Sequence, residues 1–340
     1  MKRFEIRALC MLTAISLLTF TAFILPMPGF AESQTKEPVA VTMIADEIGL
    51  GDGAFNDLIY SGLMRAEKKL KISVSAVEPA SEAAYSEMRG VAQSGSADLI
   101  VASGFTLAFA TSLCANEFPD QKFAIVDSYV DLPNVANLNF KANEGSFLVG
   151  VIAGLTTTTD KIGFVGGMEI YLDPSFEYGF KAGVISVNPD AVVFVNFADS
   201  FTDPDAGYAA AMALIDLDAD VIYHAAGLSG EGVIQAAADQ GIWAIGVDVD
   251  QSSLNPDAVL CSMVKKVDNA TYLVIKSVVD GSFCGDVVLG LAEDGVGYSD
   301  PVGNVPANVA AIANKYKKAI IDGNIVVPYD GSSYEIFLAQ

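Results

Sequence analysis

Short apolar runs rich in β-branched residues alternate with longer helical patterns along most of the chain. The first pair is a buried strand predicted at 39–45 and an amphipathic helix predicted at 54–70, with lysines near its end. Apolar strands that alternate with helices are typical of parallel sheets covered on both faces. The pattern therefore predicts an α/β fold with doubly wound sheets. Further strands are predicted at 71–77, 97–103, 122–127, 161–166, 191–197, 219–225 and 242–248, and further helices near 80–94, 143–158, 173–187, 204–216 and 229–240.

The length of 340 residues exceeds what one hydrophobic core usually supports, so two domains are expected. The number of strands suits two doubly wound lobes, while periodicity alone leaves an eightfold barrel open. The chain has no P-loop, and the segment IADEIGLGDGAF at 44–55 lacks the spacing of a dinucleotide-binding GxGxxG motif.

The N-terminus has the pattern of a secretory signal peptide. A basic start at 2–7 precedes an apolar run at 8–25, and small residues then surround Ala31. We expect cleavage near Ala31, which makes 1–31 the signal peptide; an uncleaved membrane anchor is the alternative. Cys10 lies too early for a lipobox, so the sequence predicts a periplasmic protein without a lipid anchor.

The formal net charge of -23 argues against binding to nucleic acid or to anionic lipid. Beyond the signal peptide the cysteines are Cys114, Cys261 and Cys284, an odd number that allows one disulfide at most. A Cys261–Cys284 bridge and buried free thiols both stay open. Their spacing matches no zinc site and His224 is the single histidine, so we expect no metal and no cofactor.

Carboxylates follow several of the predicted strands. Asp46, Asp127 and Asp248 each come directly after, or at the end of, a buried run, and Gly227 follows another. Ligands of open α/β sheets bind beyond the carboxyl ends of the strands. Acidic side chains there suit a ligand rich in hydroxyl or N–H donors, such as a sugar or a purine, and suit a phosphate poorly. An Asp in such a position can also cap the following helix.

Two phenylalanines lie near the same strand ends. Phe55 lies in the loop entering the first long helix, and Phe201 lies just past the strand predicted at 191–197. Two rings on opposite sides of a cleft could hold a flat heteroaromatic ligand by stacking and apolar burial. Each could equally be an ordinary core residue.

Seven motifs follow one another between about 39 and 328. They are GDGAFND (51–57), KFAIVD (122–127), NEGSFLVGVIAGL (143–155), KIGFVGG (161–167), AAGLSGEGVIQAA (225–237), IGVDVDQ (245–251) and SMVKKVD (262–268). In this order they resemble the BMP family of substrate-binding proteins, which includes the basic membrane proteins of spirochaetes and purine nucleoside receptors of ABC importers. The resemblance implies a type I periplasmic-binding-protein fold, with two Rossmann-like lobes joined by three crossing segments. It assigns 39–139 with 263–290 to lobe 1, and 140–262 with 291–340 to lobe 2.

The resemblance also implies roles for single residues. In the nucleoside-binding members two phenylalanine rings sandwich the purine, and acidic residues and a lysine hold the base edge and the ribose. The matching positions here are Phe55 and its neighbour Asn56, Phe201 for the second ring, Asp248 and Lys265 for the ribose, Asp46 and Asp127 for the base edge or pocket floor, and Gly227 for backbone contact. Lys266 follows Lys265 directly, so the lysine assignment could move by one residue.

The resemblance implies a monomeric binding protein that captures a purine nucleoside (inosine, guanosine or adenosine) and delivers it to a membrane permease and its ATPase. A flavin or another heterocycle is the alternative ligand. An exported nucleoside hydrolase is disfavoured, because the chain has no DxDxxxDD-type cluster of carboxylates. The chain departs from the family where the usual D-D-K/R-S-F-N reads GDGAFN at 51–56, and in its lack of a lipobox.

Overall fold

The computed structural model describes residues 38–80, 83–169 and 173–340, so the signal peptide predicted at 1–31 lies outside the described residues. Within these ranges the chain forms two six-stranded sheets. The first sheet is entirely parallel, in the order β11-β5-β4-β3-β1-β2. Its strands are β1 (Ala40–Ile44), β2 (Ser73–Val77), β3 (Leu99–Ala102), β4 (Lys122–Val126), β5 (Val135–Phe140) and β11 (Val287–Leu289).

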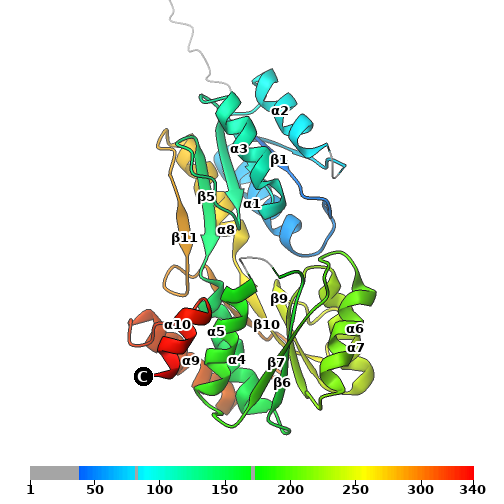
Figure 1. Ribbon diagram of the computed structural model, residues 1–340. Coiled ribbons are helices and arrows are strands. Elements are labelled where there is room, and N and C mark those ends of the chain that lie inside the picture. The colour runs from blue at the N-terminus through cyan, green and yellow to red at the C-terminus, as the bar shows by residue number, and fades with distance from the viewer. Residues whose placement is uncertain (1–37, 81–82, 170–172) are drawn as a thin grey trace, which may run out of the picture. The chain divides into compact units, whose positions relative to one another are not determined.

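Helices cover both faces of the first sheet (Figure 1). Successive residues of its central strands point to opposite faces, so Met43 packs against α1 and α8 while Ile44 packs against α2 and α3. This is why these strands are apolar without alternation. The helices are α1 (Phe55–Leu70), α2 (Ala84–Ser94), the short 3-10 helix η1 (Phe105–Leu107), α3 (Ala108–Glu117) and α8 (Val267–Val279).

The second sheet has the order β12-β10-β9-β8-β6-β7, and only its edge strand β12 is antiparallel among the described strands. Figure 1 shows α6 and α7 on one face and α4, α5 and α9 on the other. The strands are β6 (Lys161–Gly166), β7 (Val192–Phe197), β8 (Val221–Ala225), β9 (Trp243–Asp248), β10 (Val259–Lys265) and β12 (Val296–Ser299). The helices are α4 (Ala142–Thr156), α5 (Asp173–Ile185), α6 (Pro204–Ile215), α7 (Ser229–Gln240), α9 (Ala307–Ile321) and α10 (Gly331–Leu338).

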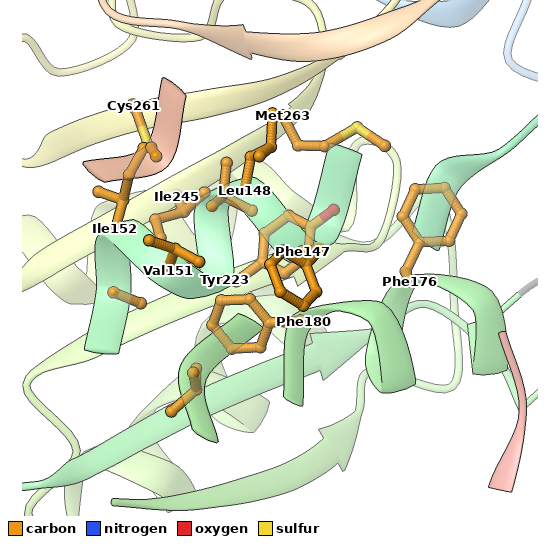
Figure 2. Close-up of a cluster of buried hydrophobic side chains, with 14 of the residues drawn as sticks. Phe147, Leu148, Val151, Ile152, Phe176, Phe180, Tyr223, Ile245, Cys261 and Met263 are labelled. Carbon is orange, nitrogen blue, oxygen red and sulfur yellow. The ribbon is translucent and has the colours of Figure 1, made fainter. Parts of the chain in front are cut away.

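The largest core of the second lobe lies between its sheet and α4 and α5 (Figure 2). Phe147, Phe180 and Tyr223 are fully buried there, and the Phe180 and Tyr223 rings have centroids 5.0 Å apart. Glycines let the two helices approach closely, because a Cβ at Gly150 would lie 2.2 Å from the carbonyl oxygen of Phe180. The two-lobed α/β fold is thus confirmed, and the eightfold barrel is excluded.

The predicted strands and helices agree with the structure except at their ends. The helix predicted from 80 begins at Ala84, and the strand predicted from 71 begins at Ser73. Cys261 is buried in the core of the second lobe, whereas Cys284 packs against the core of the first lobe. All three described cysteines are free thiols, so the structure has no Cys261–Cys284 bridge.

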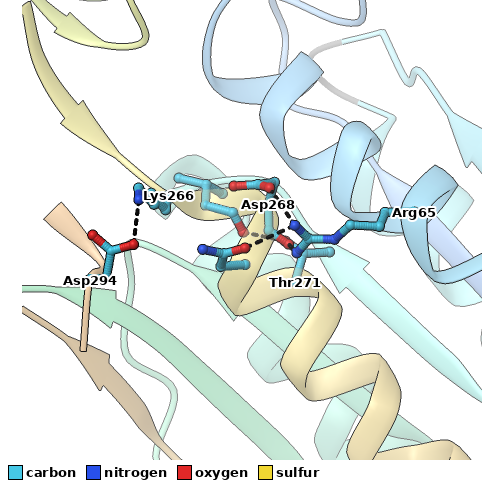
Figure 3. Close-up of polar contacts among 7 residues, drawn as sticks. Arg65, Lys266, Asp268, Thr271 and Asp294 are labelled. Atoms are coloured by element: carbon cyan, nitrogen blue, oxygen red, sulfur yellow. Dashed lines mark hydrogen bonds and ion pairs between the residues drawn. The ribbon is translucent and has the colours of Figure 1, made fainter. Parts of the chain in front are cut away.

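Three segments cross between the lobes: β5 to α4, β10 to α8, and β11 to β12. Backbone hydrogen bonds tie them together, from Lys141 N to Leu289 O at 3.0 Å and from Lys266 N to Gly295 O at 2.8 Å. The Lys266 side chain also pairs with Asp294 (Figure 3). These contacts make the crossing segments one connected hinge.

Arg65 attaches this hinge to the first lobe (Figure 3). Its guanidinium donates to Asp268 Oδ2, to the Asp268 carbonyl and to Asn269 Oδ1, each at 2.9 Å. It also stacks over the Tyr272 ring at 4.8 Å. The start of α8 is therefore held against α1, immediately after the chain leaves β10.

In the second sheet β10 pairs with β9 up to Val264 and with β12 up to Lys265. We therefore propose that the second crossing lies after Lys265 and not at 263.

Candidate ligand-binding site

A pocket lies at the carboxyl ends of the strands of both sheets. Among the residues predicted for the site, all but Asn56 line it. First-lobe residues on the pocket are Asp46, Glu47, Ile48, Phe55, Gly104, Phe105, Thr106 and Asp127; those from the second sheet and its helices are Phe176, Phe201, Ala225, Gly227, Val247, Asp248 and Lys265.

Lys265 lies at the centre of the charged part of the pocket. It stands at the end of β10, is 4% exposed, and forms an ion pair with Asp127 from the first sheet. Its Nζ lies 3.3 Å from Asp248 Oδ1 of the second sheet. Burial would lower the pKa of Lys265, but the two carboxylates outweigh burial and raise that pKa, so the side chain stays charged. One ammonium group therefore connects carboxylates of both sheets.

Asp127 and Asp248 occupy equivalent places in the two sheets. Asp127 follows β4 and Asp248 ends β9, and each of these is the third strand in the order given above for its sheet. Both have left-handed backbones, with φ of 52° and 65°. Asp tolerates this conformation better than most residues, and such strain is concentrated at functional sites.

The carboxylates of this centre differ in their environments. Burial raises the pKa of Asp127, and contact with Lys265 opposes that rise. Asp248 Oδ1 is buried and accepts no well-aligned hydrogen bond within the described ranges, although it lies close to the Lys265 ammonium. Because Asp248 also lines the pocket, its carboxylate can offer an acceptor to hydroxyl groups of a ligand.

Asp46 adds a further acceptor from the first lobe. Its Oδ1 receives hydrogen bonds from Asn56 Nδ2 at 2.8 Å and from Ile48 N at 2.9 Å. Burial raises the pKa of Asp46, and the hydrogen bond from Asn56 partly opposes the rise. Asn56 itself is fully buried behind Asp46 and is not on the pocket wall.

Aromatic rings from both lobes face the pocket. Phe55 begins α1, and Lys265 Nζ lies 5.4 Å from its ring centre; the Phe176 ring is 5.5 Å from the same nitrogen. Phe201 meets the first-lobe residue Phe105 edge to face, with ring centroids 5.8 Å apart. The pocket therefore combines apolar faces with a charged floor.

Two glycines make room for Phe201. A Cβ at Gly167 would lie 2.2 Å from Phe201 Cε1, so the ring rests directly on the backbone after β6. Gly227 has φ of +56°, and a Cβ there would lie 2.9 Å from the Phe201 carbonyl oxygen. Both glycines are therefore required where they stand.

His224 lies outside the pocket wall, next to pocket residues. It is fully buried next to the pocket residue Ala225, and its Nε2 lies 2.9 Å from Gln251 Oε1, which also accepts the Val247 N–H at 2.9 Å. Burial lowers the pKa of His224 to about 4, so the ring is neutral at physiological pH. No group of His, Cys, Asp and Glu in the described ranges is arranged to hold a metal ion.

The sequence prediction missed several pocket residues. Phe105 and Thr106 follow Gly104 after β3, so the strand-end rule that identified Asp46 could have found them. Phe176 comes from inside α5, where that rule says nothing.

These features define the class of protein. Two α/β lobes, three crossing segments and a pocket at the strand ends of both sheets are the architecture of a solute-binding protein. A solute-binding protein of an ABC transporter system from Aeropyrum pernix K1 has the same fold, with a TM-score of 0.76 and 29% identity over 89% of this chain and 97% of that one.

The chain belongs to the Bmp family, because residues 39–330 match the family model described as "ABC transporter substrate-binding protein PnrA-like". It is 36% identical to the CD4+ T-cell-stimulating antigen of Listeria innocua, over 87% of this chain and 90% of the antigen. It is 34% identical to basic membrane protein A of Borreliella burgdorferi, over 85% of this chain and 88% of that protein. The resemblance drawn from the seven motifs is confirmed, and the chain has a solute-binding role.

Among the described helices, none has both the length and the apolar character needed to cross a membrane.

Proposed function

We propose that this solute-binding protein captures a purine nucleoside and hands it to an ABC importer. The observation that carries the proposal is the presence of Phe55 from the first lobe and Phe201 from the second on one pocket. A flat purine between such rings gains stacking and apolar burial. Binding both rings at once would also favour the closed arrangement of the lobes, because the ligand then contacts each of them.

The polar groups support a ligand that is uncharged and rich in donors. Asp248 and Lys265 together offer acceptors and a donor suited to ribose hydroxyls. The pocket wall carries four carboxyl groups, on Asp46, Glu47, Asp127 and Asp248, against the single ammonium of Lys265. A phosphate group would meet net repulsion there, so a nucleoside is favoured over a nucleotide.

We also propose a location and a partner for the protein. It acts as a monomer in the periplasm after removal of the signal peptide near Ala31, and its closed form docks on a permease with an attached ATPase. The family description supports a transporter partner. The basic start, apolar run and small residues of the N-terminus support export.

A thermal-shift screen tests the ligand. The mature protein is unfolded and refolded to remove bound molecules, then heated with purine nucleosides, free bases, ribose and riboflavin. A ligand that binds only the folded state adds about 2.7 kcal/mol of stability at about 100 times its Kd. We expect a raised Tm with nucleosides and little change with ribose. Stabilisation by riboflavin alone would assign a flavin instead, and silence across the panel would reject the nucleoside.

Matched variants connect the result to the pocket. Phe201→Ala should abolish most of the shift, whereas Phe109→Ala should keep it, because Phe109 is an exposed α3 residue outside the pocket. Chromatography of the ligand after incubation should recover intact nucleoside; release of free base would instead indicate a hydrolase.

A further inference from the structure

Asn56 connects the pocket carboxylate Asp46 to two other segments of the first lobe. Its Nδ2 donates to Asp46 Oδ1 at 2.8 Å and to Asp52 Oδ2 at 3.1 Å. Its Oδ1 accepts the hydroxyl of Ser103 at 2.7 Å and the backbone N–H of Asp46 at 3.3 Å. Asn56 Nδ2 faces two carboxylate oxygens and Asn56 Oδ1 faces two hydrogen-bond donors, so a flipped amide would lose these hydrogen bonds.

The backbone of Asn56 is held just as firmly. Asp52 caps the start of α1 by accepting the N–H groups of Ala54 at 2.9 Å, Asn56 at 2.8 Å and Asp57 at 3.1 Å. Asp57 returns the contact by accepting Gly51 N at 2.8 Å. The amide that faces Asp46 therefore stands on a fixed turn, although this turn carries glycines where the family usually carries charged residues.

The two carboxylate oxygens of Asp46 have different surroundings. The hydrogen bonds from Asn56 and from Ile48 both end on Oδ1 of the Asp46 carboxylate. The backbone N–H of Gly49 also donates to this carboxylate. The other oxygen, Oδ2, lies beside pocket residue Gly104, 3.9 Å from the place where a Cβ would stand. Oδ2 therefore lies on the pocket side of the carboxylate, whereas Oδ1 is turned toward Asn56.

We propose that Asn56 is a positioning residue that holds Asp46 so that Oδ2 accepts one N–H or O–H donor of the bound ligand. Asn56 acts through Asp46 and does not touch the ligand. The choice of a nucleoside as the probe rests on the proposed function, whereas the effect of Asn56 on Asp46 does not.

The electrostatics support this role. Burial raises the pKa of Asp46 and repulsion from Asp52 adds to the rise, while the Asn56 amide, shared between the two carboxylates, lowers that pKa. Removing the amide should therefore raise the pKa of Asp46 further. The other charged groups around this end of the pocket are Glu47 on the same loop, Asp57 on α1, Glu78 after β2, and Asp127, Asp248 and Lys265 on the pocket floor.

The test uses Asn56→Leu, with Asn137→Leu as a matched control. Asn137 is another buried asparagine of the first lobe whose Nδ2 donates to a carboxylate, Asp286 Oδ1, at 2.7 Å, and it lies outside the pocket. A milder variant, Ser103→Ala, removes only the hydroxyl that orients the Asn56 amide, in case Asn56→Leu does not fold.

Two readouts are needed. Carbon-13 NMR of the empty protein follows the titration of Asp46, assigned by its loss in Asp46→Asn. Calorimetry with inosine between pH 4.5 and 8 follows binding. We expect Asn56→Leu to move the Asp46 titration and the acid limb of inosine affinity to higher pH, and to weaken binding about tenfold at neutral pH. Ser103→Ala should shift both in the same direction by less, and Asn137→Leu should change neither.

The outcomes separate the two proposals. An unchanged Asp46 titration in folded Asn56→Leu, or in Ser103→Ala if only that variant folds, would overturn the role of Asn56. If the wild type binds no nucleoside, the proposed function fails, and the NMR titration still decides whether Asn56 controls Asp46.

Discussion

Replacement of Lys265 by methionine should destabilise the protein severely. The change keeps most of the side-chain volume and removes the ammonium group that contacts Asp127 and Asp248 in a buried place. Breaking a buried ion pair by removing one partner costs about 3–5 kcal/mol, since the other charge stays buried without compensation. For a chain of this size, with an unfolding entropy of about 2.1 cal/mol/K per residue, that loss corresponds to a fall in Tm of about 5–8 °C.

The loss should depend on pH in a defined direction. Without Lys265 the pKa of Asp127, already raised by burial, rises further. The native state then binds a proton more tightly than the unfolded state, so the variant recovers stability as pH falls from 7 toward 5. Urea unfolding at several pH values measures this recovery against the wild type.

Two further variants make the test specific. Lys161→Met removes an exposed ion pair with Asp218, at 2.6 Å, and should cost less than about 1 kcal/mol. Asp127→Asn removes one charge that Lys265→Met leaves buried, so adding it to Lys265→Met should restore part of the stability. Asparagine also tolerates the left-handed backbone at this position. If Lys265→Met is no less stable than Lys161→Met at pH 7, the buried charge centre does not exist in solution.

Three other predictions concern the pocket. Phe201→Ala should weaken nucleoside binding by about 1–3 kcal/mol, the usual value of one base stacked on a ring, with an unchanged circular dichroism spectrum; full affinity by calorimetry would refute the stacking role. Gly167→Ala should weaken binding similarly, since the added methyl group displaces the Phe201 ring, and a crystal structure with the ring unmoved would contradict this. Asp46→Asn should be at least as stable as the wild type at pH 7, because a carboxylate with a raised pKa opposes folding when it is ionised. The difference in unfolding free energy between the two proteins should shrink as pH falls. A variant that is less stable than the wild type at pH 7 would count against the reasoning.

Most of the strands could be read from the sequence because buried parallel strands are continuous apolar runs. β5 was missed because its sequence, VANLNF, contains asparagines that look like a loop. Asn137 is nevertheless buried, since its side chain accepts the Val130 N–H at 2.8 Å and donates to Asp286. Such partners are distant in sequence, so the local pattern could not reveal them.

The site residues were predictable to the extent that strand ends converge. Asp46, Asp127 and Asp248 all reach one pocket for this reason. The position of Asn56 behind Asp46 was not predictable, because whether a side chain lines a pocket or lies behind its neighbour depends on packing. Lys265 appeared only through the family motif, and its contact with both sheets required the folded hinge.

The position of the single tryptophan decides how binding can be observed. Trp243 begins β9 while Asp248 ends it, so the indole lies five residues, about 17 Å, from the pocket end of the same strand. Trp243 is half-buried and packs against the core of the second lobe. Intrinsic fluorescence should therefore remain nearly constant during a ligand titration and change only when that lobe unfolds. Trp243 fluorescence should therefore report unfolding of the second lobe and not ligand binding. Detection of ligand binding by fluorescence requires a probe attached near the pocket.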